Sequence, residues 1–411
     1  MKYFLIIFLS WFTGLQSQAS SWVVGPGKPL TTIRAALLKA QSGDTVWVLP
    51  GLYREGNLVI SQSIALIGRS YPVIDGEYKY ENISVKAGHV LVEGFRIIQS
   101  GVSSIEDFAG IKIYNQRDVV IRNNILEKTF FGIYMQYAVR CAIEGNVLKA
   151  YGQQEQQSGN GIHCWKSDSL HIRGNRINGH RDGIYFEFVT HSVIEKNISE
   201  RNLRYGLHFM FSDNDAYIGN TFMQNGAGVA VMFTHHVRMF DNDFIENWGD
   251  GAYGLLLKEI SDAEIGGNRI FGNTVGIFME GSNRLHLQGN QFRNNGWAMK
   301  VLANCVDIRV RANNFIGNSF DVGTNGSLVL NSFNGNYWDK YEGYDLNRDR
   351  TGDIPYRPVS LYAMIVEQNP SAMILFRSFM ASLLDKTEKV VPTITPENLK
   401  DNQPRMKPVP L

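Results

Sequence analysis

The sequence predicts an all-β fold, a right-handed single-stranded parallel β-helix, from two repeating patterns and a high glycine content. In the first pattern an asparagine, usually after glycine and two residues before Ile, Leu or Phe, returns at intervals of mostly 22 or 23 residues. It occupies Asn123, Asn146, Asn175, Asn197, Asn220, Asn242, Asn268, Asn290, Asn313 and Asn336. Repeats of this length without helical periodicity are typical of strands that coil and stack turn upon turn.

The second pattern is a glycine followed by an aliphatic residue and a short alternating run. It reads GIYMQY, GIHCWK, GIYFEF, GLHFMF, GVAVMF, GLLLKE and GIFMEG. Side chains alternate between the faces of a strand, and the aliphatic residue and the one two positions later are apolar in every copy, so both face the interior. We expect the asparagine at each corner to adopt left-handed geometry and to stack as an amide ladder inside the coil. Parallel crossovers favour the right hand.

The chain divides into three predicted parts. Residues 1–19 resemble a cleaved secretory signal peptide, with one lysine, an apolar run and a small-x-small site at 17–19; an uncleaved anchor is the alternative. The β-helix spans 20–338, and an amphipathic helix over 31–40 covers its first turn. Residues 339–411 form a capping and partner-docking region, with a helix that Asn369 caps and a flexible proline-rich tail.

Charge and cysteine content limit the possible functions. The chain carries 40 basic and 39 acidic residues, a net charge of +1, without a basic stripe, which excludes a typical nucleic-acid-binding protein. Its 3 cysteines are expected to be buried free thiols in an exported protein.

The outward positions of the repeat hold a candidate metal site. His208 and Met210 lie on the outer side of one strand, and Met232 is the neighbour of Met210 on the next turn. A histidine nitrogen with thioether sulfurs is a soft ligand set that suits Cu(I). The alternative is a strip that a loop or a partner protein covers, since methionine also suits adaptable protein contacts.

Further outward residues extend this strip as a partner surface or a secondary metal surface. They are His163, Trp165, Tyr185, Glu187, His235 and His236. His163 is two turns from His208, about 10 Å, and is not expected to share its ion. The corner position of His235 and His236 is more typical of solvated turn residues.

The segment YDLNRDRTGDIPY places oxygen ligands at alternate positions, at Asp345, Asn347 and Asp349. This spacing resembles a calcium loop, but Arg350 stands where such a loop has glycine. We therefore favour a salt-bridged turn over a calcium site.

A glycan lyase, hydrolase or epimerase is the rival class, because such enzymes use β-helices. The outward acids Glu187 and Glu280 lie four turns apart, about 19 Å, which is too far for two carboxylates to act on one glycosidic bond. We therefore predict that the protein is not an enzyme. A metal-free protein-binding scaffold is the other alternative.

Long segments of the chain resemble the NosD family, periplasmic proteins of nitrous oxide reductase maturation with a pectin-lyase-like β-helix. They include GNGIHCWKSDS, GHRDGIYFEFVTHSVIEKN, RYGLHFMFSDND, NGAGVAVMFT, AYGLLLKEISD and NYWDKYEGYDLNRDRTGDIPY. The resemblance implies a denitrification protein that acts with the membrane and ATPase subunits of an ABC transporter. It also implies that copper from a lipoprotein chaperone reaches the copper-sulfide centre of nitrous oxide reductase, and that the protein meets the membrane only through its partner.

Overall fold

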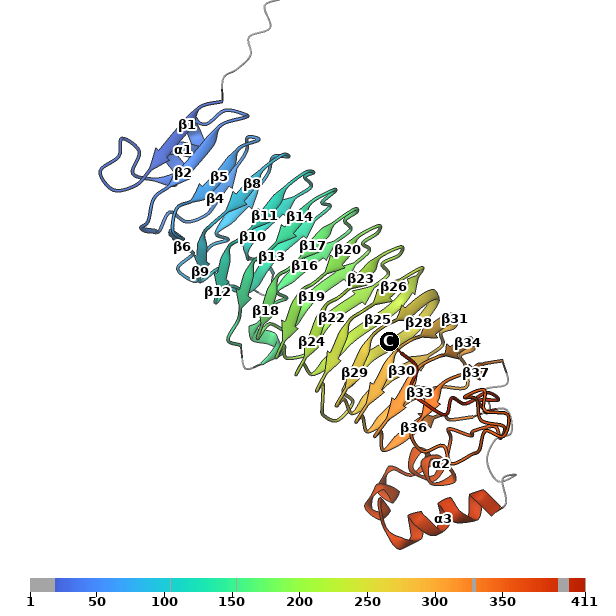
Figure 1. Ribbon diagram of the computed structural model, residues 1–411. Helices are drawn as coiled ribbons and strands as arrows, with labels where there is room; N and C mark the ends of the chain where they lie inside the picture. Colours follow the sequence, from blue (N-terminus) through green and yellow to red (C-terminus); the bar gives the residue numbers. More distant parts are fainter. Residues whose placement is uncertain (1–18, 104, 153, 327–329, 391–398, 411) are drawn as a thin grey trace, which may run out of the picture.

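The computed structural model describes residues 19–103, 105–152, 154–326, 330–390 and 399–410. They form an elongated coil of short strands with helices at both ends (Figure 1). Each strand pairs in parallel with the equivalent strands of the preceding and following turns. The predicted parallel β-helix is therefore confirmed, whereas residues 1–18 of the predicted signal peptide lie outside the described residues.

Each full turn contributes one strand to each of three faces. The first face contains β4 (Leu58–Ile60), β7 (Ile83–Val85), β10 (Ala109–Tyr114), β13 (Phe131–Gln136), β16 (Ile162–Trp165), β19 (Asp182–Glu187), β22 (Tyr205–Met210), β25 (Ala227–His235), β28 (Tyr253–Gly266), β30 (Val275–Glu280), β33 (Trp297–Val301) and β36 (Phe320–Gly323).

The second face follows the first after a corner, and β28 is long enough to belong to both. The other strands of the second face are β1 (Ser21–Val24), β2 (Thr45–Val48), β5 (Ala65–Gly68), β8 (Leu91–Glu93), β11 (Val120–Arg122), β14 (Ala142–Glu144), β17 (His171–Arg173), β20 (Val193–Glu195), β23 (Ala216–Ile218), β26 (Arg238–Phe240), β31 (Asn283–Gln288), β34 (Val306–Arg311) and β37 (Ser332–Asn334).

The third face closes each turn as a separate sheet. Its strands are β3 (Leu52–Tyr53), β6 (Val73–Asp75), β9 (Arg96–Ile98), β12 (Ile125–Glu127), β15 (Val147–Lys149), β18 (Arg176–Asn178), β21 (Ile198–Glu200), β24 (Thr221–Met223), β27 (Asp243–Ile245), β29 (Arg269–Phe271), β32 (Gln291–Arg293), β35 (Asn314–Ile316) and β38 (Tyr337–Trp338).

An asparagine ladder runs along one corner of the interior, as predicted. In each step the side-chain amide donates to the next one, for example from Asn146 Nδ2 to Asn175 Oδ1 at 3.0 Å. The ladder begins at Asn124, so the choice of Asn123 was wrong: Asn124 donates to Asn146, whereas Asn123 is exposed. The expected left-handed geometry belongs to the preceding residue, such as Gly145 with φ 60°, because the ladder residue itself must point inward.

A second interior ladder escaped the sequence analysis. It consists of Asn202, Asn225, Asn247, Asn273, Asn295 and Asn318. These asparagines repeat as regularly as the first set, so their spacing was the signal that could have revealed them. Because every amide finds partners above and below, both ladders bury polar groups without leaving them unsatisfied.

The first ladder ends at the C-terminal segment of the chain. Asp401 is fully buried, and its Oδ2 accepts hydrogen bonds at 2.9 Å from both the backbone N and Nδ2 of Asn336. Trp338 Nε1 donates to the same oxygen at 3.1 Å. The tail was expected to be flexible, but residues 399–410 lie against the last turns, because the open end of the ladder needs an acceptor. Residues 391–398 lie outside the described part of the chain.

Helices lie near both ends of the coil, and the N-terminal one packs on its core. The predicted N-terminal helix is confirmed as α1 (Ile33–Lys39), and the Thr32 side chain caps it by accepting from the N–H of Ala35. At the other end the structure has α2 (Leu361–Gln368), a 3₁₀ helix η2 (Pro370–Leu375) and α3 (Phe379–Val390). The predicted helix start is confirmed, since Asn369 is the N-cap residue of η2 and Pro370 its first residue. The prediction of one continuous helix was wrong, because the segment breaks before α3 at Arg377, which has a φ of 61°.

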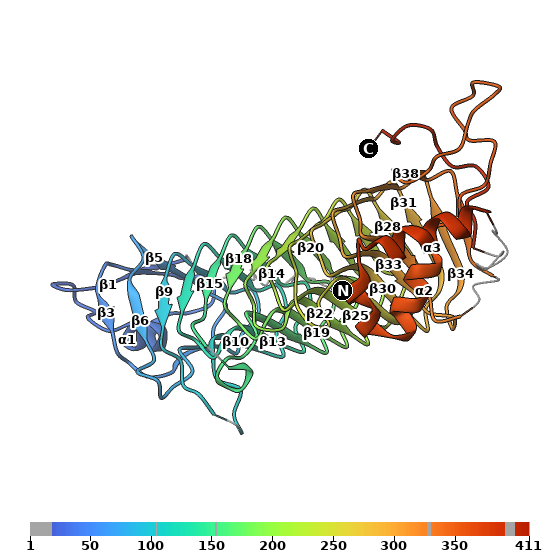
Figure 2. The same ribbon diagram turned by 90° about the horizontal axis from the view of Figure 1, so that it is seen from below.

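Helix α2 covers the outer side of the last turns of the first face, as Figure 2 shows. Tyr362, Ala363 and Val366 of α2 pack with Trp297 and Phe320 in one buried apolar cluster. A short 3₁₀ helix, η1 (Glu155–Gln157), lies in the loop before β16. The middle turns of the first face therefore carry their outward side chains between a loop and the C-terminal helices.

Candidate functional site

The strand register places the predicted metal ligands as the repeat indicated. His208 pairs with Tyr185 on β19 and Ala230 on β25, and Met210 pairs with Met232. Leu207 and Phe209, which alternate with His208 and Met210 along β22, are fully buried inside the coil. His208, Met210 and Met232 therefore point outward from neighbouring turns of the first face.

His208 points outward but is not exposed, which differs from the expected solvent-exposed strip. Only 3% of its surface is accessible. Its ring lies 5.0 Å from that of Tyr185 and 4.8 Å from that of Tyr205, so the two tyrosines shield it. Met210 and Met232 remain half-buried beside it.

A buried ionic cluster surrounds His208. Arg204 Nη2 lies 3.0 Å from His208 Nδ1, and Asp182 Oδ2 lies 3.7 Å from the same nitrogen. Arg204 Nε is also 3.4 Å from Asp182 Oδ1. Asp182 is fully buried, and Arg181 from its own strand end adds a second cation at 3.8 Å. The outward face thus combines a histidine, a carboxylate and two guanidinium groups.

The sequence analysis missed Asp182 and Arg204 because it aligned only the residues after the recurring glycine. The glycine interrupts the alternation of the strand, since Asp182 pairs with Tyr205 and Ile184 pairs with Leu207. A Cβ on Gly183 would lie 2.0 Å from Ser199 Oγ in the interior, so the residue before the glycine points outward. The recurring arginine and the acid in HRDG and LRYG were the available signal.

Tyr185 links the histidine to the methionine. Its hydroxyl lies 3.7 Å from Met210 Sδ and 3.4 Å from Glu187 Oε2. Burial raises the pKa of Tyr185 to about 12, so the phenol stays protonated and acts as a donor at neutral pH. Glu187 and Met210 thus share one hydroxyl donor on adjacent turns.

His163 occupies the same outward strand position as Tyr185 and His208, two turns before His208, but its surroundings differ. Its ring stacks between Tyr134, at 4.4 Å, and Tyr185, at 4.8 Å. Asn160 Nδ2 lies 2.9 Å from its Nδ1, and burial lowers the pKa of His163 to about 3. Because Tyr185 separates His163 from His208, the two imidazoles are not brought together.

The remaining predicted residues lie at the edge of this face. Trp165 packs 4.9 Å from Tyr137 and accepts a cation–π contact from Lys166. His235 and His236 lie beyond the corner and are exposed, and His235 Nδ1 lies 2.6 Å from Ser261 Oγ. The corner histidines therefore do not join the group formed by His208, Met210 and Met232.

An exposed aromatic stack lines the same edge and was not foreseen. Phe188, Phe211 and Phe233 occupy successive turns with ring separations of 5.2 and 5.1 Å. They are 44%, 40% and 39% exposed, and each has a positive φ of 50–55°. Corner residues elsewhere in the coil, such as Tyr137 and Lys166, share this positive φ, whereas three stacked phenylalanines in solvent are unusual. The stack lies next to Met210 and Met232 in the chain.

Among the described residues, no three His, Cys, Asp or Glu side chains lie close enough together to hold a metal ion. The predicted ligand set differs from such a group, because two of its three members are methionine thioethers, which are ligands for soft ions.

Backbone amides hold the candidate calcium loop. Asp345 accepts from the N–H groups of Asp349 and Arg350, and Asn347 accepts from Asp349. Ion pairs to Arg348 and Arg350 were expected, but across the residues that the structure describes the loop relies on these carboxylate–amide bonds. The carboxylate oxygens are thus engaged in shaping the turn.

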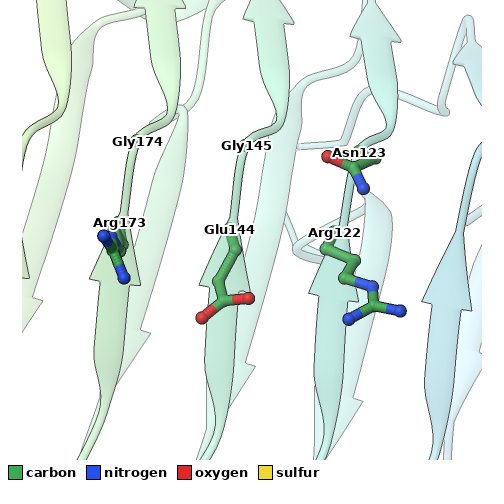
Figure 3. A pocket seen from close by; sticks show the side chains of 6 residues that line it. All are labelled: Arg122, Asn123, Glu144, Gly145, Arg173 and Gly174. Carbon is green, nitrogen blue, oxygen red and sulfur yellow. The ribbon is translucent and has the colours of Figure 1, made fainter.

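A shallow depression of about 360 Å³ lies on the second face, where Arg122, Glu144 and Arg173 stand side by side on neighbouring strands (Figure 3). Arg122 pairs with Glu93 at 2.8 Å and Arg173 with Glu195 at 3.3 Å. The alternating charges link successive turns, and exposed pairs of this kind contribute at most about 1 kcal/mol each. None of the predicted site residues lies here.

Comparison with known proteins identifies relatives over most of the chain. Residues 149–343 match the family described as "Periplasmic copper-binding protein (NosD)", and residues 57–177 and 82–215 match a right-handed β-helix family. The "Probable ABC transporter binding protein NosD" of Pseudomonas aeruginosa is 28% identical over 384 residues, which cover 89% of either chain. The protein of the same name from Stutzerimonas stutzeri is 26% identical and covers 89% of this chain and 87% of its own. The family resemblance and the hand of the coil are thus confirmed.

Solved structures with low identity share the fold. The catalytic unit of an α-1,3-glucanase from Streptomyces thermodiastaticus has a TM-score of 0.61 at 15% identity; the match covers 74% of this chain and 65%, less than two thirds, of the enzyme. PfbA, a surface adhesin of Streptococcus pneumoniae, has a TM-score of 0.55 at 12% identity, with 71% and 87% covered. An enzyme and an adhesin thus share this scaffold, so the fold by itself does not decide the activity.

Proposed function

We propose that this chain is a periplasmic accessory protein that handles copper together with an ABC transporter, because residues 149–343 match the NosD family. The family description names copper and the periplasm, and the names of the two curated relatives contain the words "ABC transporter binding protein". In this proposal copper is the cargo that the protein passes on, and the protein catalyses no reaction.

The position of the outward strip carries this proposal. His208, Met210 and Met232 all lie inside the matched domain and on adjacent strands of one face. His208 Nε2 is buried without a hydrogen-bond partner, and the two half-buried thioethers stand on the paired positions beside it. One imidazole and two thioethers form a neutral, soft ligand set, which fits Cu(I) better than a hard divalent ion.

The finer role that we propose is delivery of copper for the copper-sulfide centre of nitrous oxide reductase. The family resemblance supports it, with a lipoprotein copper chaperone as the donor. The aromatic stack of Phe188, Phe211 and Phe233 offers the donor an apolar contact surface directly beside the strip. Export through the predicted signal peptide would place the protein in the periplasm.

The C-terminal region is proposed to dock on the membrane subunit of the transporter. Ile374 and Phe379 are 89% and 81% exposed, and Met380 and Leu383 on α3 are also exposed. Apolar side chains gathered in solvent mark an interaction surface. In the described part of the chain no helix has the length and apolarity needed to cross a bilayer, so the membrane subunit supplies the contact in this proposal.

A Cu(I) titration of the exported chain under reducing conditions tests the copper site. We expect near-stoichiometric binding by the parent and loss of binding when His208→Ala, Met210→Ala and Met232→Ala are combined. The matched control combines His286→Ala with Met223→Ala, a histidine and a methionine on the second and third faces, and it should bind copper like the parent. Thermal unfolding of all three proteins checks that the coil remains folded.

Three outcomes would each contradict a different part of the proposal. If the triple variant binds Cu(I) as tightly as the parent, the site assignment is wrong. If the parent binds none even with its transporter and copper donor present, the metal-free scaffold is the better description. Turnover of a uronate polysaccharide by the purified chain would instead favour the lyase or epimerase alternative.

A further inference from the structure

The contact between Arg204 and His208 determines which nitrogen of the imidazole carries the proton. Arg204 Nη2 lies 3.0 Å from His208 Nδ1. A guanidinium group only donates hydrogen bonds, so Nδ1 must be the acceptor. In the neutral ring the proton then resides on Nε2, which is buried and has no partner. This arrangement is the opposite of what a metal ligand needs, because a protonated Nε2 has no lone pair to offer.

Asp182 stands ready to support the other tautomer. Its Oδ2 lies 3.7 Å from His208 Nδ1 and has no hydrogen-bond partner, although the residue is fully buried. Without the guanidinium, this oxygen is the nearest acceptor for an Nδ1 proton. A carboxylate that accepts from one ring nitrogen fixes the tautomer and makes the other nitrogen a better metal ligand.

We propose that Arg204 acts as a gate on the copper site: while it donates to Nδ1, His208 cannot bind the metal, and its withdrawal lets Asp182 take over Nδ1 and frees Nε2. The ring stays neutral, because a proton leaves Nε2 and one arrives at Nδ1 by exchange with water. The inference rests on the proposed copper function, and it names Arg204 and Asp182 as the residues that position the ligand.

Burial shows which of the partners can move. The Arg204 side chain is 35% exposed, whereas those of Asp182 and His208 are 0% and 4% exposed. The guanidinium packs over the Tyr205 ring at 4.7 Å, and its Nε lies 3.4 Å from Asp182 Oδ1 without forming a hydrogen bond. The arginine can therefore swing toward solvent or toward an anionic group of a docking protein, while the buried Asp182 and His208 stay in place.

Arg181 supplies a matched control. Its side chain is also 35% exposed, and its Nε lies 3.8 Å from Asp182 Oδ2. It shares the charge and the carboxylate with Arg204, but Arg204 is the arginine whose contact with the His208 ring defines the tautomer. A purely electrostatic role for the arginine pair would make the two residues equivalent.

The test uses the full exported chain with ¹⁵N-labelled histidine, as parent, Arg204→Leu, Arg181→Leu, and Arg204→Leu combined with Asp182→Asn. Nitrogen chemical shifts report which ring nitrogen is protonated, and competition with a Cu(I) chelator reports affinity. We expect Nδ1 of His208 to be unprotonated in the parent and in Arg181→Leu, and protonated in Arg204→Leu. Copper affinity should rise about 10-fold to 100-fold in Arg204→Leu and fall back when Asp182→Asn is added.

The two readouts separate the failure of the gate from the failure of the copper function. The gate is overturned if Nδ1 is already protonated in the parent, if Arg204→Leu leaves it unprotonated, or if the tautomer changes while the affinity of a copper-binding parent does not. If the tautomer changes as expected but neither the parent nor Arg204→Leu binds copper, the proposed copper function is wrong, and so is the gate on a copper site. The assignment of the hydrogen bond between Arg204 and His208 would still hold.

Discussion

The outer side of the first face has two regions built on the same strand positions. Helix α2 covers one of them, the covered region, whereas the other, the open region, has no covering helix in the described part of the chain and buries Asp182 and His208 with neighbouring side chains. The strand position that precedes the recurring glycine holds Asp182 and Tyr205 in the middle turns and Val275 later in the coil. Its register partners in the last turns are Trp297 and Phe320. Helix α2 buries Val275, Trp297 and Phe320 in an apolar cluster. The β-helix therefore accepts different residue types at these positions. They are apolar under helix α2, whereas Asp182 and Tyr205 make them charged and polar in the open region.

The largest expected loss of stability follows from replacing Trp297 in the covered region. Trp297 is 6% exposed and stacks on Phe320 at 4.3 Å. Trp297→Ala is expected to destabilise the folded chain by about 3–5 kcal/mol in urea unfolding and to release the 361–390 segment to proteolysis. Tyr205→Ala, at the equivalent but half-buried position of the open region, should cost less than half as much. Equal costs would mean that the two regions do not differ as described.

The interior offers a contrast to both outer regions through Asp215, a fully buried acid whose Oδ2 has no partner. Burial raises the pKa of Asp215 from its ordinary value of 3.8 to about 8. Unfolding therefore releases a proton between these values, so the stability present below pH 3.8 is lost as the pH rises to about 8.

Asp215→Asn should remove this pH dependence. We expect the variant to lose roughly 5 kcal/mol less than the parent between pH 4 and pH 8, which a series of denaturant titrations would measure. Asp262, a half-buried corner acid that pairs with Arg284, provides the control variant Asp262→Asn. Because this ion pair lowers the pKa of Asp262, the slope of the variant should stay close to that of the parent above pH 4. A parent whose stability does not fall with pH would contradict the assignment.

The smallest effect on stability is expected on the outer side of the covering helices. Ile374 and Phe379 do not belong to the cluster that holds α2 in place. Ile374→Ser with Phe379→Ser should therefore change the unfolding free energy by no more than about 0.5 kcal/mol per site. The same variant should lose co-purification with the transporter membrane subunit in detergent, whereas Leu38→Ser, an 83% exposed residue of α1, should retain it. Retention of the complex by the helix variant would remove this docking surface.

The repeat made much of the fold predictable. Periodic glycines and apolar residues specify the turn length, the register and the inward columns, because strand alternation is strict within each short run. The same alternation places His208, Met210 and Met232 on adjacent strands, and the strand register confirms it. It failed at Gly183, where the alternation restarts, and therefore missed Asp182 and its arginine neighbours.

The sequence by itself determined the coil, its first ladder and the outward direction of the candidate ligands, since each depends on contacts that repeat every turn. The burial of His208, the contact of Arg204 with its Nδ1, and the closing of the ladder by Asp401, 65 residues beyond Asn336, are visible only in the folded chain. Tyr185 is the neighbour of His208 on the preceding turn, but the Arg204 and Asp401 contacts join residues without any periodic relation. Their cause is the need of each buried polar group for a partner, and that need constrains the chemistry of the partner but not its place in the chain.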